Sequence, residues 1–303
     1  MSIIHGTDLV KAYGRLRALD GADLRVETGQ VHGFLGPNGA GKSTLIKALL
    51  GQITLSAGTL HVFGLDPRRD AVAIHRRLAY VPADVSLWPS LTGGECLDML
   101  ARFHGGENRA RRDHLVDAFS LDIRKKARTY STGNRQKVAL IAALSLDADL
   151  YVFDEPTSGL DPLMEARFQE AVMELSSRGA TVLLSSHILD EVEALCSHVT
   201  ILKDGRTISS GTLEALRQES TTTIVATLAN ADAAEAVRRQ LTEQGADASI
   251  SSDATGIHLT VRSPRPAVAQ AVTAVAAADP LSLVVRPPSL DELFLEHYEV
   301  QAR

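Results

Sequence analysis

The sequence predicts an α/β protein with two domains, and three observations support this. Between residues 3 and 210, short apolar runs alternate with stretches of helical periodicity, which is typical of a layered α/β domain. A glycine-rich loop stands between one such run and one such helix. After residue 220 the composition shifts towards Ala, Val, Thr and Ser. With 303 residues, the chain has room for a large domain over 1–219 and a smaller one over 220–303.

Composition limits the function classes. The chain has 45% hydrophobic and 22% charged residues, as in an ordinary globular protein, and its formal net charge of −6 disfavours a nucleic-acid partner. The apolar stretches 138–146 and 271–277 are too short to span a bilayer, and the first eight residues do not resemble a signal peptide. We therefore expect a cytosolic chain that reaches a membrane only through a partner. Cys96 and Cys196 lack metal-ligand spacing, so we expect reduced thiols and no structural zinc.

The first elements are predicted to be strands at 22–27 and 31–35. The segment 36–43, Gly-Pro-Asn-Gly-Ala-Gly-Lys-Ser, matches the phosphate-binding pattern G-x-x-x-x-G-K-[ST]. Glycines let backbone N–H groups turn inward around phosphate oxygens, and a helix predicted at 44–50 directs its positive dipole end there. The loop therefore predicts binding of a nucleoside triphosphate, with Lys42 on the outer phosphates and the Ser43 hydroxyl on Mg²⁺. The alternative is a chance glycine-rich turn, which the flanking strand and helix disfavour.

The next strand that carries chemistry is 150–153, because it ends in two carboxylates. A buried strand delivers such residues to the carboxyl edge of the sheet, where open α/β sheets bind ligands. Asp154 is predicted to hold Mg²⁺, and Glu155 to orient and deprotonate an attacking water. The remaining secondary structure of this domain is predicted as strands at 78–81, 181–184 and 199–202, a hairpin at 203–206 and a helical region at 92–144.

Ser131 and Gly133 open a helix within the helical region, which is again an arrangement that can bind phosphate. Because the loop at 36–43 already serves this chain's own nucleotide, a second such element would serve the nucleotide of another subunit. The alternative is simple N-capping of the helix by Ser131 or Thr132.

In the order and spacing of these motifs, residues 3–215 resemble the ATP-binding subunit of an ATP-binding-cassette (ABC) transporter. The resemblance implies a P-loop ABC ATPase domain with a RecA-like α/β core, an antiparallel β subdomain and a helical subdomain. It implies ATP and Mg²⁺ as cofactors, catalytic roles for Glu155, His187 and Lys42, and metal contacts from Ser43 and Asp154. It also implies nucleotide contacts from Tyr13, Gly36, Pro37, Asn38, Gly39, Ala40, Gly41, Lys42, Ser43, Thr44, Ser131, Gly133 and Asp161.

The resemblance gives some of these residues specific roles. Tyr13 would stack on adenine, and His187 would contact the γ-phosphate. Asp161 ends the segment 158–161, which would contact the second subunit. The implied assembly is a homodimer that sandwiches ATP and acts on a separate transmembrane permease from the cytoplasmic face of the membrane, as a peripheral subunit.

Two positions depart from the family pattern. The signature segment 130–134 is Tyr-Ser-Thr-Gly-Asn where the family's common form is Leu-Ser-Gly-Gly-Gln. Ala83 occupies the position where the family usually has a glutamine that contacts Mg²⁺ and the attacking water, and Asp84 is a hypothetical substitute. Trp88, the only tryptophan, lies in the segment 84–92 that would receive the permease, and the sequence leaves open whether it is an interface anchor or a core residue.

The second domain is predicted to be α+β. Strands at 223–228, 246–251, 256–261 and 281–286 and helices at 231–244 and 266–277 give the order β-α-β-β-α-β of a ferredoxin-like arrangement, followed by a helix at 289–299. The segment 288–295 resembles the corresponding part of bacterial drug- and antibiotic-export ATPases.

The predicted function is therefore an ATPase subunit that powers export of drugs, antibiotics or lipophilic compounds. The alternatives are a soluble non-transport ABC ATPase and an ATP-dependent regulator. The single phosphate loop and the absence of a heptad-rich insertion disfavour the first of these. No residues of the small domain form a convincing ligand site, which disfavours the second.

Overall fold

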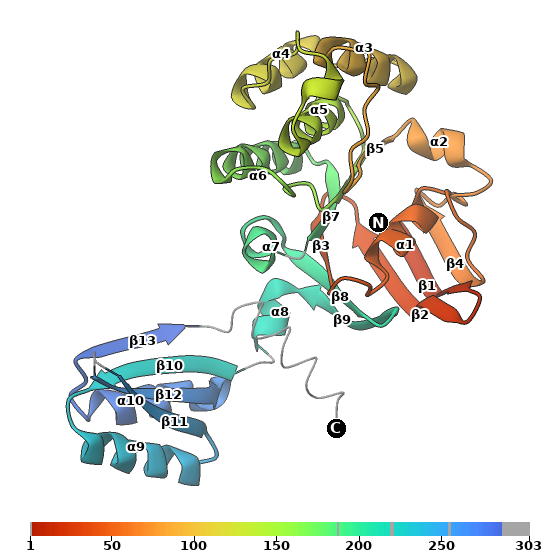
Figure 1. The fold of residues 1–303 in the computed structure, drawn as a ribbon. Coiled ribbons are helices and arrows are strands. Elements are labelled where there is room, and N and C mark those ends of the chain that lie inside the picture. Colours follow the sequence, from red (N-terminus) through yellow and green to blue (C-terminus); the bar gives the residue numbers. More distant parts are fainter. Residues whose placement is uncertain (1, 187, 219–220, 254–255, 287–303) are drawn as a thin grey trace. The chain divides into compact units, whose positions relative to one another are not determined.

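The computed structural model describes residues 2–186, 188–218, 221–253 and 256–286 (Figure 1). The chain divides into two compact units, Met1–Gly211 and Thr212–Arg303. The domain boundary that the sequence suggests near residue 219 stays a prediction. His187, the helix predicted at 289–299 and the segment 288–295 lie outside the described residues.

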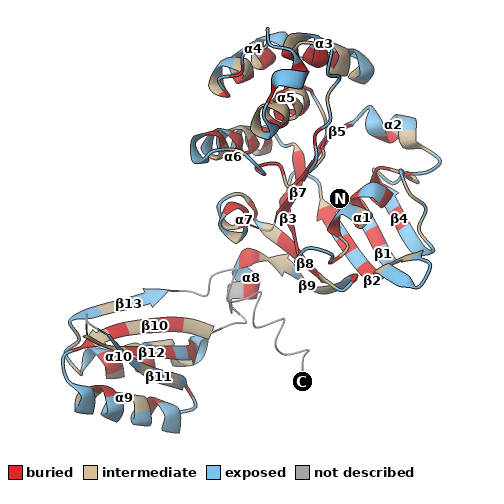
Figure 2. Ribbon diagram, in the orientation of Figure 1, coloured by how far each residue is buried: buried red, intermediate tan, exposed pale blue. Residues whose placement is uncertain are grey.

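A six-stranded sheet forms the centre of the first unit, in the strand order β5-β6-β7-β3-β8-β9. The pairs β5–β6, β6–β7, β7–β3 and β3–β8 are parallel. Three of these strands are buried along their whole length, as Figure 2 shows, because a parallel sheet is covered on both faces. The strands are β3 (Val31–Leu35), β5 (Leu78–Val81), β6 (Leu150–Asp154), β7 (Thr181–Ser186), β8 (His198–Lys203) and β9 (Arg206–Thr212).

A second, antiparallel sheet has the strand order β2-β1-β4. Its strands are β1 (Ser2–Tyr13), β2 (Leu16–Glu27) and β4 (Ala57–Val62). Helix α1 (Lys42–Leu49) joins this sheet to the central sheet through one apolar cluster, which contains Ile4 and Val26 of the antiparallel sheet, Leu45 of α1, and Phe34 and Val152 of the central sheet. The phosphate loop, which precedes α1, is therefore anchored between two sheets.

The remaining helices include a group that lies together at the top of Figure 1. Helix α3 (Gly93–His104) begins at a capping box in which Thr92 and Glu95 bond each other's backbone N–H groups. It is followed by α4 (Arg109–Ala118), a 3₁₀ turn (Ala127–Thr129) and α5 (Thr132–Leu144), which confirms the helical region predicted from the sequence. The other helices of the first 218 residues are α2 (Ala71–His75), α6 (Pro162–Ser177), α7 (Leu189–Leu195) and α8 (Leu213–Gln218).

The second unit contains α8 and, after it, follows the predicted order β-α-β-β-α-β over its described residues. Its strands pair in the order β11-β12-β10-β13, every pair is antiparallel, and the unit has a separate apolar core. The elements are β10 (Thr221–Leu228), α9 (Ala231–Glu243), β11 (Asp247–Asp253), β12 (Gly256–Pro264), α10 (Val268–Ala276) and β13 (Ser282–Arg286). Among the residues that the structure describes, no helix has the length and apolar character needed to cross a bilayer.

Candidate functional site

The phosphate loop joins the buried strand β3 to helix α1 and is closed by backbone contacts. Gly36, Gly39 and Gly41 have φ angles of 156°, 86° and 108°, which disfavour residues with a side chain. A Cβ atom at Gly36 would overlap the carbonyl oxygen of Leu202, and one at Gly41 would overlap that of Ala18. The loop therefore forms a cradle of backbone atoms, which fits a bound phosphate chain.

Lys42 lies inside this cradle, with only 5% of its surface exposed. Its ammonium group donates hydrogen bonds to the carbonyl oxygens of Gly36, at 2.6 Å, and Pro37, at 3.3 Å. Burial lowers the pKa of Lys42, whereas the charges of Glu155 and Asp154 act to raise it. The structure thus brings the loop lysine and the two carboxylates at the end of β6 into one electrostatic environment.

The other loop residues differ in exposure. Pro37, Asn38 and Ser43 are exposed, and Thr44 is half-buried in the first turn of α1. Ala40 is buried and ties the loop to the β8–β9 hairpin, because its carbonyl oxygen accepts a 2.9 Å bond from the N–H of Gly205. The Ser43 hydroxyl therefore lies at an accessible position next to the buried lysine.

Asp154 ends strand β6 and is 4% exposed. The Ser185 hydroxyl donates a 2.5 Å bond to its Oδ1 atom. On the neighbouring strand β5, burial and the charge of Asp154 raise the pKa of Tyr80 to about 12, so the phenol stays protonated. A buried carboxylate whose orientation is fixed in this way presents hard oxygen donors, which suit Mg²⁺.

Glu155 follows in a left-handed backbone conformation, with a φ of 48°. Its N–H donates a 3.0 Å bond to the carbonyl oxygen of Ser185, which holds this geometry. Non-glycine residues rarely adopt such angles, and when they do they cluster at functional sites. The backbone therefore turns sharply at the residue predicted to act as the base.

The predicted signature residues begin helix α5. The Ser131 side chain accepts a 3.3 Å bond from the N–H of Asn134, so Ser131 caps the helix in this chain and remains exposed. A Cβ atom at Gly133 would lie 2.5 Å from the carbonyl oxygen of Gly159. Tyr130, which replaces the family's usual leucine, is buried, and its hydroxyl donates a 2.7 Å bond to the carbonyl oxygen of Asp122.

Asp161 is likewise a helix cap. Its Oδ1 atom accepts a 3.1 Å bond from the N–H of Met164 at the start of α6. His187 lies outside the described residues. The preceding residue, Ser186, donates a 2.7 Å bond to Oε2 of Glu191, which joins the end of β7 to α7.

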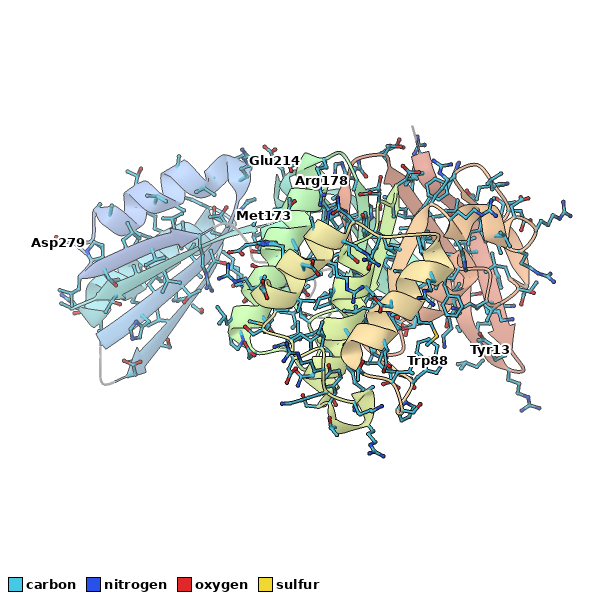
Figure 3. The ribbon with its side chains drawn as sticks, turned by 90° about the horizontal axis from the view of Figure 1, so that it is seen from above. Tyr13, Trp88, Met173, Arg178, Glu214 and Asp279 are labelled. Atoms are coloured by element: carbon cyan, nitrogen blue, oxygen red, sulfur yellow. The ribbon has the colours of Figure 1, made fainter. Side chains whose placement is uncertain are left out.

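Tyr13 is 48% exposed at the end of β1, and the Lys11 ammonium lies 4.8 Å from its ring centroid (Figure 3). Tyr13 pairs with Leu16 across the β1–β2 turn. Two residues further along β2, the carbonyl oxygen of Ala18 lies against Gly41 of the phosphate loop. The hairpin that carries Tyr13 is therefore a neighbour of the loop.

Sequence reasoning missed two residues that shape the site. The parallel register of β6 and β7 places Ser185 next to Asp154. The sequence alone does not indicate this contact, because it does not specify which strands pair or in which register. Gln136 is 2% exposed, and its amide donates a 2.9 Å bond to the carbonyl oxygen of Pro156, which joins α5 to the turn after Glu155. A buried glutamine inside an apolar helix is the signal that could have identified it.

Beyond β5, the chain borders an apolar groove of about 240 Å³ between the segment after β5 and helices α3 and α5. Trp88 is 41% exposed and Phe103 is 74% exposed, so Trp88 is not a core residue. Ala83 and Asp84 are exposed at the start of this segment. The groove lining includes Tyr80, Pro82, Leu87, Trp88, Leu100 and Phe103.

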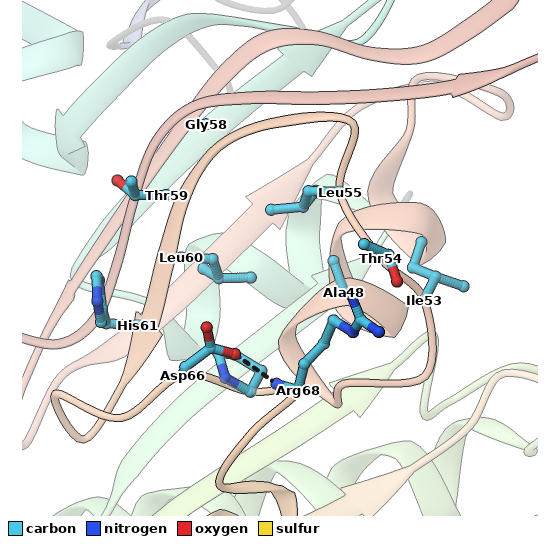
Figure 4. Close-up of a pocket in the computed structure, with 11 residues that line it drawn as sticks. Ala48, Ile53, Thr54, Leu55, Gly58, Thr59, Leu60, His61, Asp66 and Arg68 are labelled. Carbon is cyan, nitrogen blue, oxygen red and sulfur yellow. Dashed lines mark hydrogen bonds between the residues drawn. The ribbon is translucent and has the colours of Figure 1, made fainter.

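A second hollow, of about 280 Å³, lies between the end of α1 and strand β4 (Figure 4). Asp66 at its rim accepts a 2.8 Å bond from the N–H of Arg68. Leu55 and Leu60 form part of its apolar wall. It contains none of the residues predicted for the nucleotide site.

The chain resembles proteins of known family. Residues 19–158 match the family model described as "ABC transporter". The chain is 34% identical over 300 residues to the daunorubicin resistance ATP-binding protein DrrA3 of Streptomyces coeruleorubidus, which covers 94% of this chain and 92% of that protein. It is 36% identical over 304 residues to the daunorubicin/doxorubicin resistance ATP-binding protein DrrA of Streptomyces peucetius, with coverage of 96% and 91%.

Solved structures give the same fold. An ATP-binding subunit of an ABC transporter superposes with a TM-score of 0.68 at 32% identity, over 71% of this chain and 92% of that chain. A dimeric ATP-binding cassette bound to ADP and phosphate superposes with a TM-score of 0.63 at 23% identity, over 69% of this chain and 98% of that chain. At 23% identity, the likeness to the dimeric cassette shows a shared fold only.

Proposed function

This chain belongs to the ABC transporter family of ATP-binding proteins, and from that premise we propose that it powers export of drugs, antibiotics or other lipophilic compounds through a separate permease. As a member of that family the chain is an ATPase. The relatives named for daunorubicin and doxorubicin resistance support export as the direction and drug-like compounds as the cargo class. The proposed location is the cytoplasmic face of the membrane, where the chain would be a peripheral subunit.

The observation that carries the catalytic proposal is the environment shared by Lys42, Asp154 and Glu155. Lys42, now bonded to loop carbonyl oxygens, would bind the outer phosphates. Ser43 and Asp154 would hold Mg²⁺, which when bound neutralises charge on the phosphates during phosphoryl transfer. Glu155 would accept the proton of the attacking water, and His187 would contact the γ-phosphate.

The remaining site residues would position the nucleotide. The loop residues from Gly36 to Thr44 would surround the phosphates, and Tyr13 would stack on adenine. Ser131, Gly133 and Asp161 would act across a homodimer, in which the start of α5, where Ser131 and Thr132 are exposed, would face the partner's ATP. The dimeric cassette with the same fold supports such an arrangement.

The apolar groove supports the proposal of a permease partner. Large exposed apolar side chains such as Trp88 and Phe103 are frequent anchors of protein interfaces. We propose that an amphipathic helical segment of the permease occupies this groove, with its apolar side against these two rings.

The test of the ATP sandwich is a Glu155→Gln variant. The substitution keeps the shape of the side chain and removes the base, so the variant should bind Mg-ATP without completing hydrolysis and should accumulate as a dimer. Sedimentation velocity with and without Mg-ATP measures this. Glu170→Gln, an exposed substitution on α6, is the matched control and should stay active. A Glu155→Gln variant that remains monomeric at saturating Mg-ATP would contradict the sandwich.

The test of the transporter assignment is to recover the tagged chain from detergent-solubilised native membranes. A multi-span membrane protein recovered in comparable amount would support the proposal, and its sequence would narrow the cargo. Recovery from the soluble fraction alone would contradict it.

A further inference from the structure

We propose that Tyr130 is a positioning residue, which links the apolar groove to the signature serine Ser131 through its buried hydroxyl group. The inference rests on the proposed function, because it concerns how occupation of the groove affects the ATP site. The Tyr130 contacts would connect the groove to the ATP site without the family's usual glutamine, whose position Ala83 occupies in this chain.

The first observation is that the wall of the groove is hydrogen-bonded to the segment before the signature. The segment 88–94 begins at Trp88, whose ring lines the groove, and the segment 122–130 ends at Tyr130. Backbone bonds join the two segments repeatedly, so they form one connected unit. These bonds run from Ala127 N–H to Leu91 O (2.8 Å), Gly93 N–H to Lys125 O (3.0 Å), Gly94 N–H to Ile123 O (2.9 Å) and Arg128 N–H to Pro89 O (3.3 Å).

The second observation is the anchoring of Tyr130 inside this unit. The side chain is 4% exposed, and its hydroxyl donates a 2.7 Å bond to the carbonyl oxygen of Asp122. A Cβ atom at Gly93 would overlap that hydroxyl oxygen, so the phenol fills a space that only glycine leaves open. Tyr130 thus contacts both segments and is the residue directly before Ser131.

These contacts have a mechanical consequence. Segments held by several backbone bonds shift together, so a displacement of Trp88 by a bound permease helix would be passed to the segment 122–130. The Tyr130 hydroxyl fixes the last residue of that segment, and with it the position of Ser131. A leucine at position 130, as in the common family signature, has no hydroxyl and cannot make this bond.

Coupling between two sites is reciprocal, which allows a test without the permease. If occupation of the groove favours one position of Ser131, then engagement of Ser131 in an ATP-bound dimer favours the matching conformation of the groove, and we expect the surroundings of Trp88 to report it. Trp88 is the single tryptophan of the chain, so its fluorescence reports the groove alone.

The experiment titrates Mg-ATP into the Glu155→Gln chain and measures dimer formation by sedimentation and Trp88 emission and acrylamide quenching in the same samples. We expect the Trp88 signal to change with the same ATP midpoint as dimer formation, and Mg-ADP to leave it unchanged. With Tyr130→Phe added, the Trp88 change per dimer should fall by about threefold or more.

Tyr151→Phe in the same background is the matched control. The Tyr151 hydroxyl also donates a 2.7 Å bond from a buried ring to a backbone carbonyl oxygen, that of Leu146, and it accepts a 3.3 Å bond from the N–H of Ala148. Leu146 lines the groove, but it lies beyond the end of α5 that is opposite Ser131. Tyr151→Phe should therefore lower the stability of the fold at least as much as Tyr130→Phe and leave the Trp88 response of the dimer intact.

The outcomes separate the inference from the proposed function. A dimer that forms without any change at Trp88, or a Tyr130→Phe variant whose Trp88 response equals that of the Tyr151→Phe control, overturns the role of Tyr130 and leaves the ATP sandwich standing. Failure of the parent Glu155→Gln chain to dimerise overturns the sandwich and this inference together.

Discussion

The hydroxyl group of Ser185 donates a 2.5 Å hydrogen bond to Oδ1 of Asp154 and so joins the ends of two adjacent parallel strands. The carbonyl oxygen of the same serine accepts the N–H of Glu155. One residue on β7 therefore contacts both Asp154, which ends β6, and Glu155, which directly follows it.

Removing this hydroxyl should weaken the metal site. In Ser185→Ala, Asp154 loses the partner that fixes its carboxylate, so we expect the Mg²⁺ dependence to shift or kcat to fall by about 10- to 100-fold. Steady-state ATPase assays over a range of Mg²⁺ concentrations measure this. Ser145→Ala is the control, because it also deletes a fully buried serine hydroxyl, one that donates to the carbonyl oxygen of Ala142. Equal effects of the two substitutions would argue against the orienting role.

Acid should destabilise the first unit through His32. Its ring is 2% exposed, and burial, with a smaller effect of the charge of His198, lowers its pKa from 6.5 to about 3. The unfolded chain therefore binds one more proton than the folded chain between these values. The contribution of neutral His32 to the free energy of unfolding is therefore fully present above about pH 6.5. Between that pH and about pH 3, it should fall by about 1.4 kcal/mol per pH unit.

Urea unfolding at pH 7.5, 5.5 and 4.5, followed by Trp88 fluorescence, measures this slope within the first unit. His32→Gln does not titrate in this range, so its stability should lose less on acidification than that of the wild type. Identical slopes for the two chains would show that His32 does not contribute.

Restoring the family's glutamine should accelerate hydrolysis. Ala83 is exposed, so a longer side chain can extend from this position without displacing the core. Because Ala83→Gln would supply an amide near the attacking water, we expect kcat to rise by roughly tenfold. Ala83→Asn, one methylene shorter, should give a smaller rise. An unchanged kcat in Ala83→Gln would indicate that another group, such as Asp84, already orients the water.

A charge in the apolar groove should weaken permease binding. Phe103 is 74% exposed, so Phe103→Glu should alter the stability of the isolated chain by no more than about 0.5 kcal/mol. Recovery of the permease with the tagged chain should nevertheless fall by about tenfold or more, as for a hot-spot residue. Met173→Glu, an exposed substitution on α6 outside the groove, is the control (Figure 3). Equal recovery with both variants would place the permease elsewhere.

The buried strands of the central sheet could be predicted from the sequence, because strands covered on both faces are continuous apolar runs. The runs at 31–35 and 150–153 gave β3 and β6 within one residue. β1 was not identified as an individual strand. Its pairings with β2 and β4 contain register shifts, and these bulges interrupt the alternation of apolar and polar residues that would have identified it.

The residues of the candidate site divide in the same way, into those that a local sequence pattern identifies and those that only the tertiary structure identifies. The phosphate loop and the acids after β6 are local patterns, and the sequence carries them complete. Contacts such as Ser185 with Asp154, or Gln136 with the carbonyl oxygen of Pro156, join residues that are distant along the chain. They depend on strand register and helix packing, which one sequence without strand pairing does not specify. The hydrogen bond of the Tyr130 hydroxyl is another such contact. The sequence shows that tyrosine stands where the family usually has leucine, and only the structure shows that its hydroxyl donates to the carbonyl oxygen of Asp122.

The left-handed backbone of Glu155 also bears on how this chain can evolve. A non-glycine residue at a φ of 48° costs about 1 kcal/mol or more relative to glycine, which adopts the same angles without strain. Selection for thermal stability alone would therefore favour Glu155→Gly, which abolishes the proposed base. Persistence of glutamate at this position over generations of laboratory drift would measure how strongly the host depends on hydrolysis rather than on a folded chain.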